Sequence, residues 1–239
     1  MQLFISDLHL APERPEITQA FFHFLDGTAK NATELYILGD FFNAWLGDDD
    51  DTPEFVEIIA KLAQYTQHTA TFLMHGNRDF LIGETFAKQT GVTLLTEPSL
   101  INVNNKQTLL IHGDSLCTLD TEYMAFRQMV RQREWQQTVL AKPLEERKSL
   151  AKQLRDTSQS MNSLKADDIM DVTPDEVIQL MTKYKTERLI HGHTHRPARH
   201  DIDINDNTAE RIVLGDWEKQ GWYLMADGKN LTLISFDIA

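Results

Sequence analysis

The chain has 239 residues, of which 41% are hydrophobic, and its formal net charge is −13. This length can bury one large core, and no linker-like, repeated or low-complexity stretch divides it, so we expect a single domain over residues 1–239. The strong negative charge argues against broad nucleic-acid binding, which needs a basic surface to neutralise phosphates.

The cysteine count and the hydrophobic pattern indicate the cellular compartment in which the protein is expected to work. The single cysteine, Cys117, excludes an intramolecular disulfide and is typical of a protein from a reducing cytosol. The first residues carry a polar motif after only a short apolar run, so we expect no cleaved signal peptide. No stretch reaches the roughly 20 apolar residues of a membrane-spanning helix.

Apolar runs, polar blocks and amphipathic helices alternate along the chain. The runs predict buried strands at 2–6, 35–38, 71–74, 109–111 and 188–190. Helical periodicity predicts helices around 17–25 and 53–65. The polar blocks that follow the strands are Asp7-Leu8-His9, Gly39-Asp40, Gly76-Asn77-Arg78-Asp79, His112-Gly113-Asp114 and Gly192-His193-Thr194-His195. Because ligands bind at the carboxyl ends of strands in open α/β sheets, we expect these blocks to meet.

Two regions depart from this alternation. Residues 119–168 predict helices, with Tyr123, Phe126 and Val130 on one apolar stripe, and form an insertion that overhangs the site. Between residues 121 and 155, eight Lys or Arg face four Glu, which offers a place for an anionic partner. After Pro197, consecutive strands are predicted around 212–214, 222–225 and 231–236, with turns at Gly215-Asp216 and Asp227-Gly228. The expected fold is α/β, with two packed mixed sheets flanked by helices in four layers.

The polar blocks contain ligands for two divalent metals. Asp7 and His9 combine an oxygen with an imidazole nitrogen, which suits Mn²⁺, Fe²⁺ or Zn²⁺ better than Ca²⁺. Asp40 can bridge two ions about 3.5–4 Å apart, and Asn77 adds a neutral oxygen. His112, His193 and His195 complete the set, and we expect the i,i+2 pairs to point the same way on extended backbone. Two cations and an activated water indicate phosphoester cleavage without a covalent nucleophile.

These blocks resemble the calcineurin-like metallophosphoesterases, whose pattern is D-x-H, G-D, G-N-H-[D/E], a lone H and G-H-x-H. Arg78 stands where the broad family has histidine, and we expect it to clamp a phosphate. The longer motifs are similar to those of the UDP-2,3-diacylglucosamine hydrolase family of the lipid A pathway. They are FISDLHL, YILGDFFNAWLGDDD, HGNRDFLIG, HGDSLCTLD and LIHGHTHRPARH.

The resemblance implies hydrolysis of UDP-2,3-diacylglucosamine to UMP and 2,3-diacylglucosamine 1-phosphate, by water attacking the uridine-side phosphorus, with two Mn²⁺ ions. One metal would take Asp7, His9, Asp40 and His195, and the other Asp40, Asn77, His112 and His193. The implied catalytic residues are Asp40, Asn77, Arg78 and His193. The implied substrate contacts are Asn77, Arg78, Asp120, Ser158, Asn162, Lys165 and His193.

The insertion is then expected to act as a lid. Its apolar stripe could line a cleft for acyl chains, or simply pack on the main domain, and its cations could meet anionic headgroups. We expect peripheral attachment to the cytosolic face of the bacterial inner membrane, with neither a nucleic-acid partner nor an obligate protein partner. The acidic run at 48–51 is expected to be a solvated loop before the helix at Pro53.

Two other functions stay open. Another dimetal phosphodiesterase or phosphatase could act on a soluble nucleotide or a phosphoprotein, although such a substrate does not call for an amphipathic canopy. A non-catalytic metal-dependent scaffold would predict missing ligands, and all the expected ligands are present.

Overall fold

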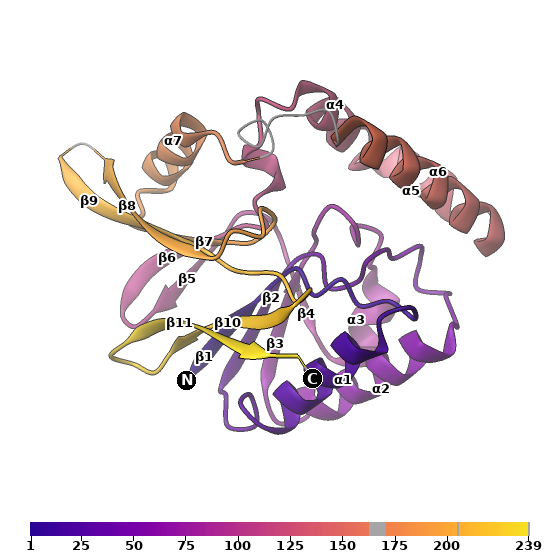
Figure 1. The fold of residues 1–239 in the computed structure, drawn as a ribbon, viewed down its shortest axis with the longest axis horizontal. Coiled ribbons are helices and arrows are strands. Elements are labelled where there is room, and N and C mark those ends of the chain that lie inside the picture. Colours follow the sequence, from indigo (N-terminus) through magenta and orange to yellow (C-terminus); the bar gives the residue numbers. More distant parts are fainter. Residues whose placement is uncertain (163–170, 205, 239) are drawn as a thin grey trace.

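Two β-sheets pack face to face, with helices on both outer faces (Figure 1). The computed structural model describes residues 1–162, 171–204 and 206–238, and the side chains of residues 155–162 lie outside this description. The strand order is β11-β10-β1-β2-β3-β4 in one sheet and β5-β6-β7-β9-β8 in the other. Both sheets combine parallel and antiparallel pairs, so the predicted fold class is confirmed.

The six-stranded sheet combines the first four strands of the chain with the last two. Its strands are β1 (Gln2–Ile5), β2 (Glu34–Leu38), β3 (Ala70–Met74), β4 (Thr93–Leu95), β10 (Gln220–Ala226) and β11 (Leu231–Asp237). Its outer face is covered by α1 (Pro15–Asp26), α2 (Pro53–Thr66) and α3 (Glu84–Thr90). Phe21 of α1 and Leu62 of α2 belong to one buried cluster with Leu3 and Leu35 of the sheet. Proline at the first turn presets the backbone angle at which α1 and α2 begin.

The five-stranded sheet completes the sandwich. Its strands are β5 (Ser99–Val103), β6 (Lys106–Leu110), β7 (Arg188–His191), β8 (Ala198–Ile204) and β9 (Asn207–Val213). Leu110 and Ile190 on its inner face pack with Phe4 and Leu38 of the other sheet. On its outer face, α7 (Pro174–Tyr184) buries Met181 in a further cluster. The layers are therefore helix, sheet, sheet, helix.

The helical insertion follows β6. After a short 3₁₀ turn, η1 (Asp114–Leu116), it consists of α4 (Thr121–Val130), α5 (Arg133–Leu140) and α6 (Leu144–Asn162), which project beyond the sheets as an arm (Figure 1). Val139 is buried in the cluster formed by the six-stranded sheet and its helices, and Trp135 and Leu150 pack against it. The helical prediction is thus confirmed as far as residue 162. Within the described part of the chain, no helix is long and apolar enough to cross a bilayer.

The C-terminal strands differ in one respect from the prediction. The turn expected at Gly215-Asp216 instead lies in a segment that carries the chain from one sheet to the other, because β9 pairs with β7 and β10 pairs with β1. This crossover places Trp217 in the buried cluster under α1.

Candidate metal centre

The strands bring the predicted ligands to one edge of the sandwich. Asp7 and His9 follow β1, Asp40 follows β2, Asn77 follows β3, His112 follows β6, and His193 and His195 follow β7. Strands β1, β2 and β3 are parallel neighbours in one sheet, as are β6 and β7 in the other. Their carboxyl ends therefore meet, as predicted.

Asp7, His9 and His195 form one ligand group, here called the Asp7 group. One ligand atom from each lies within 4.8 Å of the others. His9 Nε2 is 3.2 Å from His195 Nε2, which is 3.4 Å from Asp7 Oδ1. Asp7 Oδ1 and His9 Nδ1 are buried and have no hydrogen-bond partner in the described structure. Buried polar atoms are rarely left unpaired, so this set of nitrogen and oxygen atoms fits a divalent cation.

Asn77, His112 and His193 form a second group, here called the Asn77 group. Asn77 Oδ1 lies 3.0 Å from His112 Nε2 and 2.9 Å from His193 Nδ1. His112 Nδ1 lies 2.8 Å from the carbonyl oxygen of Leu38 and can donate to it, which directs the Nε2 atom into the site. Burial opposes a charged imidazole, but Asp40 and Asp7 raise the pKa of His112 to about 9. The site thus attracts positive charge.

Asp40 connects the two groups. Its Oδ2 lies 3.9 Å from His9 Nδ1 and its Oδ1 lies 3.7 Å from His112 Nε2. The carboxylate is 2% exposed. Burial and the nearby carboxylates of Asp79 and Asp7 raise the pKa of Asp40 to about 7. One buried carboxylate that reaches both groups has the position a bridging ligand requires.

The backbone at the ligands differs from the extended conformation predicted for Asp-x-His and His-x-His. Positive φ angles occur at Asp7 (56°), His9 (51°), Asp40 (50°), His193 (68°) and His195 (54°). For residues other than glycine, such sparsely populated conformations cost roughly 1–3 kcal/mol each. Hydrogen bonds from the Asp7 and His9 amides to Gly39 and Asp40 carbonyls, both 3.0 Å, hold two of these turns. The turns aim the side chains at common points.

Close packing explains two of the motif glycines. A Cβ atom on Gly76 would lie 2.1 Å from Asp40 Oδ1, and one on Gly192 would lie 2.3 Å from Asp7 Oδ2. Any side chain at either position would therefore displace a candidate ligand.

Comparison with known proteins classifies the chain. Residues 2–197 match the model of the calcineurin-like phosphoesterases. A UDP-2,3-diacylglucosamine hydrolase from Cellvibrio japonicus is 54% identical over 237 residues, covering 99% of each chain. One from Ectopseudomonas mendocina is 48% identical over 239 residues, covering 100% of this chain and 99% of the relative. The chain belongs to the UDP-2,3-diacylglucosamine hydrolase family of calcineurin-like phosphoesterases.

Solved structures share the fold of this phosphoesterase at much lower identity. An archaeal phosphodiesterase described as novel is 12% identical, with a TM-score of 0.51, and the match covers 98% of this chain and 99% of the other. A hypothetical protein from Pyrococcus horikoshii OT3 is 10% identical, with a TM-score of 0.52, and the match covers 100% of this chain and 89% of the other. At this identity the similarity shows the fold alone.

Arg78 of the phosphoesterase lies at the mouth of the site. Its backbone amide donates to Asp40 Oδ1 (2.9 Å), its Nε lies 3.6 Å from Asp40 Oδ2, and 40% of the side chain is exposed. Sequence reasoning gave no role to Asp79, which is fully buried and accepts hydrogen bonds from Gly76 and Phe41 amides, both at 2.7 Å. Asp79 therefore fixes the loop that carries Asn77 and Arg78.

Among the substrate contacts expected on the insertion, Asp120 is the one whose side chain the structure describes. Asp120 is buried at the start of α4, where its Oδ1 accepts a hydrogen bond from the Tyr123 amide (3.1 Å). Ser158 and Asn162 belong to α6, but their side chains lie outside the described residues, and so does all of Lys165.

The acidic run is only in part the solvated loop that was predicted, since Asp49 and Asp51 are exposed whereas Asp50 is buried. Asp48 accepts hydrogen bonds from the Gly83 amide (3.0 Å) and the Phe86 amide (2.9 Å) at the start of α3. Asp49 forms an ion pair with the buried Arg147 of α6. These carboxylates therefore attach α3 and the insertion to the loop after Asp40.

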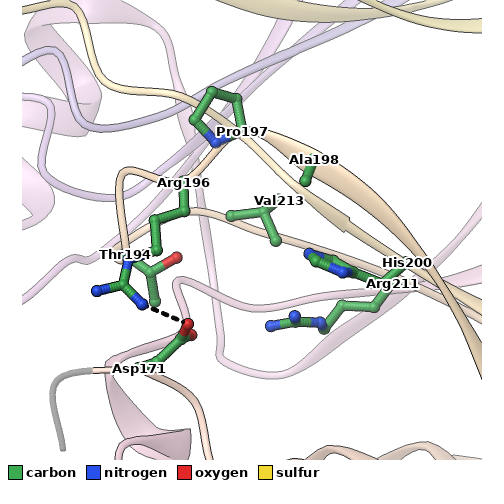
Figure 2. Close-up of a pocket in the computed structure, with 8 residues that line it drawn as sticks. All are labelled: Asp171, Thr194, Arg196, Pro197, Ala198, His200, Arg211 and Val213. Carbon is green, nitrogen blue, oxygen red and sulfur yellow. Dashed lines mark hydrogen bonds and ion pairs between the residues drawn. The ribbon is translucent and has the colours of Figure 1, made fainter. Parts of the chain in front are cut away.

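A cavity of about 240 Å³ adjoins the loop that carries His193 (Figure 2). Its lining residues are Asp171, Thr194, Arg196, Pro197, Ala198, His200, Arg211 and Val213.

His191 lies at the end of β7, just before the loop that carries His193. Burial and the Arg211 guanidinium, 3.5 Å from the Nε2 atom of His191, lower the pKa of His191 to about 3. The neutral imidazole can therefore donate from Nδ1 to the Gly192 carbonyl oxygen (2.8 Å). This contact orients the loop that carries His193 and His195.

Proposed function

We propose that this phosphoesterase hydrolyses the pyrophosphate bond of UDP-2,3-diacylglucosamine, releasing UMP and 2,3-diacylglucosamine 1-phosphate. The main support is the full-length, 54% identity with a relative of that name. The convergence of two ligand groups on Asp40 agrees with it, because a pyrophosphate is anionic and repels an attacking water unless positive charge is supplied.

One cation would be held by Asp7, His9, Asp40 and His195, and the other by Asp40, Asn77, His112 and His193. Bound divalent cations, Mn²⁺ by the expectation from the sequence, would neutralise phosphate oxygens and make a water more acidic. Burial and nearby histidines lower the pKa of His193 to about 4, so its imidazole is neutral and available as a ligand at pH 7. Arg78 can offer a planar pair of donors to a phosphate oxygen at the site mouth.

The insertion would hold the diacylglucosamine part, with Asp120, Ser158, Asn162 and Lys165 as proposed sugar and phosphate contacts. The predicted apolar stripe is divided, since Val130 is buried whereas Phe126 is partly exposed. Leu119, Met129 and Leu140 are 56%, 42% and 40% exposed. These apolar groups and the exposed Lys142 and Lys148 support peripheral attachment to the cytosolic face of the inner membrane.

One assay tests the activity directly. Pure protein with Mn²⁺ and UDP-2,3-diacylglucosamine in ¹⁸O-labelled water is expected to release UMP that carries the label, which would locate the attack at the uridine-side phosphorus. A chelator should stop the reaction. Labelled diacylglucosamine phosphate would contradict the proposed position of attack. Comparable turnover of a soluble nucleotide diphosphate, with none of the lipid substrate, would favour a different phosphodiesterase.

A further inference from the structure

Tyr123, Arg127 and Arg131, the last being the C-cap residue of α4, lie on one face of the helix, because residues four positions apart share a side. That face meets the body of the phosphoesterase. Tyr123 contacts one member of the Asn77 group directly. Arg127 and Arg131 each contact a residue that is bonded to another member.

Tyr123 contacts the His193 side of this group. Its ring lies over the His193 ring, with centroids 6.1 Å apart and planes inclined by 27°. Its hydroxyl donates to Oδ2 of the fully buried Asp114 (2.5 Å), which fixes the position of the ring. Tyr123 therefore restricts the movement of the His193 imidazole.

Arg127 reaches His112 through one carboxylate. Its Nε donates to Asp114 Oδ2 (2.8 Å), and its guanidinium also donates to Glu97 Oε2 (2.9 Å). The other Glu97 oxygen accepts a hydrogen bond from the His112 amide (2.8 Å). Charge-assisted bonds of this kind are short and directional, so α4 is coupled to the backbone of a candidate ligand.

Arg131 contacts the Asn77 side. Its guanidinium donates to the carbonyl oxygen of Gly76, the residue before Asn77, at 2.8 Å. It also lies over the Phe80 ring, 5.5 Å from the centroid. The loop between β3 and α3 is thus held from above by α4.

The Asp7 group has a different environment. In the described structure its contacts come from the body: Ser6 and the His193 amide donate to Asp7, and Asp216 lies 3.8 Å from His195. The second anchor of the insertion, Arg147, bonds to Asp49 and to the Leu46 carbonyl oxygen. That anchor contacts none of the candidate ligands.

We propose that α4 is a brace for the Asn77 group, so that docking of α4 and cation binding in this group strengthen each other, whereas the Asp7 group binds its cation independently of α4. Tyr123, Arg127 and Arg131 are positioning residues in this scheme. The coupling is necessarily reciprocal. If docked α4 raises the affinity for the cation by a given factor, the bound cation raises the docking equilibrium constant of α4 by the same factor. The inference rests on the two-cation centre proposed above.

Calorimetric titration with Mn²⁺ tests the brace in two backgrounds. His195→Ala removes the Asp7 group and leaves the Asn77 group, whereas Asn77→Ala does the reverse. Adding Arg127→Met should weaken Mn²⁺ binding about 10- to 100-fold in the His195→Ala background, the usual effect of losing a group that orients a ligand. It should leave binding unchanged in the Asn77→Ala background. Arg147→Met, which removes the other anchor, is the matched control and should change neither affinity.

The possible failures are distinguishable. If the unmodified protein binds one Mn²⁺ at saturation, the two-cation centre is wrong. If it binds two, and Arg127→Met weakens both groups equally or neither, the centre stands and the brace is wrong.

Hydrogen exchange provides a second measurement that does not depend on the Arg127 variant. Saturating Mn²⁺ should slow amide exchange in α4 about tenfold or more in His195→Ala protein, in keeping with the reciprocal coupling. It should have no such effect in Asn77→Ala protein. Equal exchange in α4 with and without Mn²⁺ in the His195→Ala protein would contradict the brace.

Discussion

Asp40 is the residue on which both ligand groups depend. Its carboxylate reaches His9 and His112, and because its pKa is raised to about 7, nearby positive charge favours its ionised form at neutral pH. We predict that Asp40→Ala lowers kcat/KM for UMP release by roughly 10³-fold, because transition-state charge loses its stabilisation. Steady-state kinetics and metal analysis check this. Asp51→Ala, at an exposed acid nearby, is the control, and a comparable loss there would contradict a specific role for Asp40.

Arg78 offers a test of phosphate recognition that is separate from metal binding. A hydrogen bond to a charged group contributes about 1.5–3 kcal/mol, so Arg78→Ala should lower kcat/KM roughly 10- to 150-fold. Arg78→Lys keeps the charge but loses the planar pair of donors, and it should recover only part of the loss. The Mn²⁺ content of both variants should equal that of the unmodified protein. Normal kinetics of Arg78→Ala would disprove the clamp.

The pKa values of the candidate histidine ligands predict how metal affinity depends on pH. Carboxylates raise the pKa of His112 to about 9 despite burial, whereas burial is the main cause that lowers the pKa of His9 to about 3 and of His193 to about 4. At pH 7 only His112 of these three is protonated, and a cation must displace its proton. We therefore predict release of about one proton or more per protein at pH 7, and affinity that rises with pH up to about 9.

Calorimetry of Mn²⁺ binding in buffers of different ionisation enthalpy measures the released protons. The observed heat should change with the buffer by an amount that corresponds to at least one proton. Heat that is independent of the buffer at pH 7 would show that His112 is neutral before the cation binds.

At the scale of elements, Arg147 joins α6 to the loop after Asp40. It is 3% exposed and donates to Leu46 O and Asp49. We predict that Arg147→Ala raises the rate of amide exchange in the described part of α6 roughly 10- to 150-fold, since hydrogen bonds to a charged group contribute about 1.5–3 kcal/mol. Lys148→Ala is the control, because its ion pair with Glu145 is exposed and should contribute little. Equal exchange in both variants would contradict the anchor.

The strands and the ligand set could be predicted from sequence because each depends on local pattern. Apolar runs identified β1, β2, β3, β6 and β7, and the polar blocks after them supplied the ligands. Strands β4, β5 and β8 were missed. Strand β8 alternates partly buried with exposed residues at a sheet edge, and its sequence, ARHDIDI, is largely polar. The left-handed turns at Asp7 and His193 could not be predicted either, because contacts between strands impose them against local preference.

The partners of the buried charges also escaped prediction. Arg127 bonds to Asp114 and to Glu97, which lie 13 and 30 positions away in the sequence, and Arg147 bonds to Asp49 98 positions away. The eight cations of the insertion were read together as a surface for an anionic partner. Three of them, Arg127, Arg131 and Arg147, instead bond to the body. A count of charges does not show which of them are used internally.

At the scale of the whole molecule, the net charge of −13 opposes binding to an anionic membrane, so any attachment must be local. The insertion presents Lys142 and Lys148, each 43% exposed at the side chain and in a surface ion pair with Glu146 and Glu145 respectively, near the exposed Leu140. Each lysine near an anionic surface contributes about 1 kcal/mol. We predict that Lys142→Ala with Lys148→Ala weakens binding to phosphatidylglycerol-containing vesicles about 30-fold at low salt, measured by flotation.

The direction of attachment makes this prediction specific. Lys88→Ala with Lys229→Ala removes the same charge from exposed positions outside the insertion, and should leave binding nearly unchanged if the insertion faces the membrane. Raising the ionic strength to 1 M shortens the screening length to about 3 Å and should remove most of the difference between the two double variants. Leu140→Ala should weaken binding at both salt concentrations, because burial of its side chain is not electrostatic. An equal loss of vesicle binding in the two double variants would mean that binding depends on the net charge of the protein alone and that the insertion has no special role.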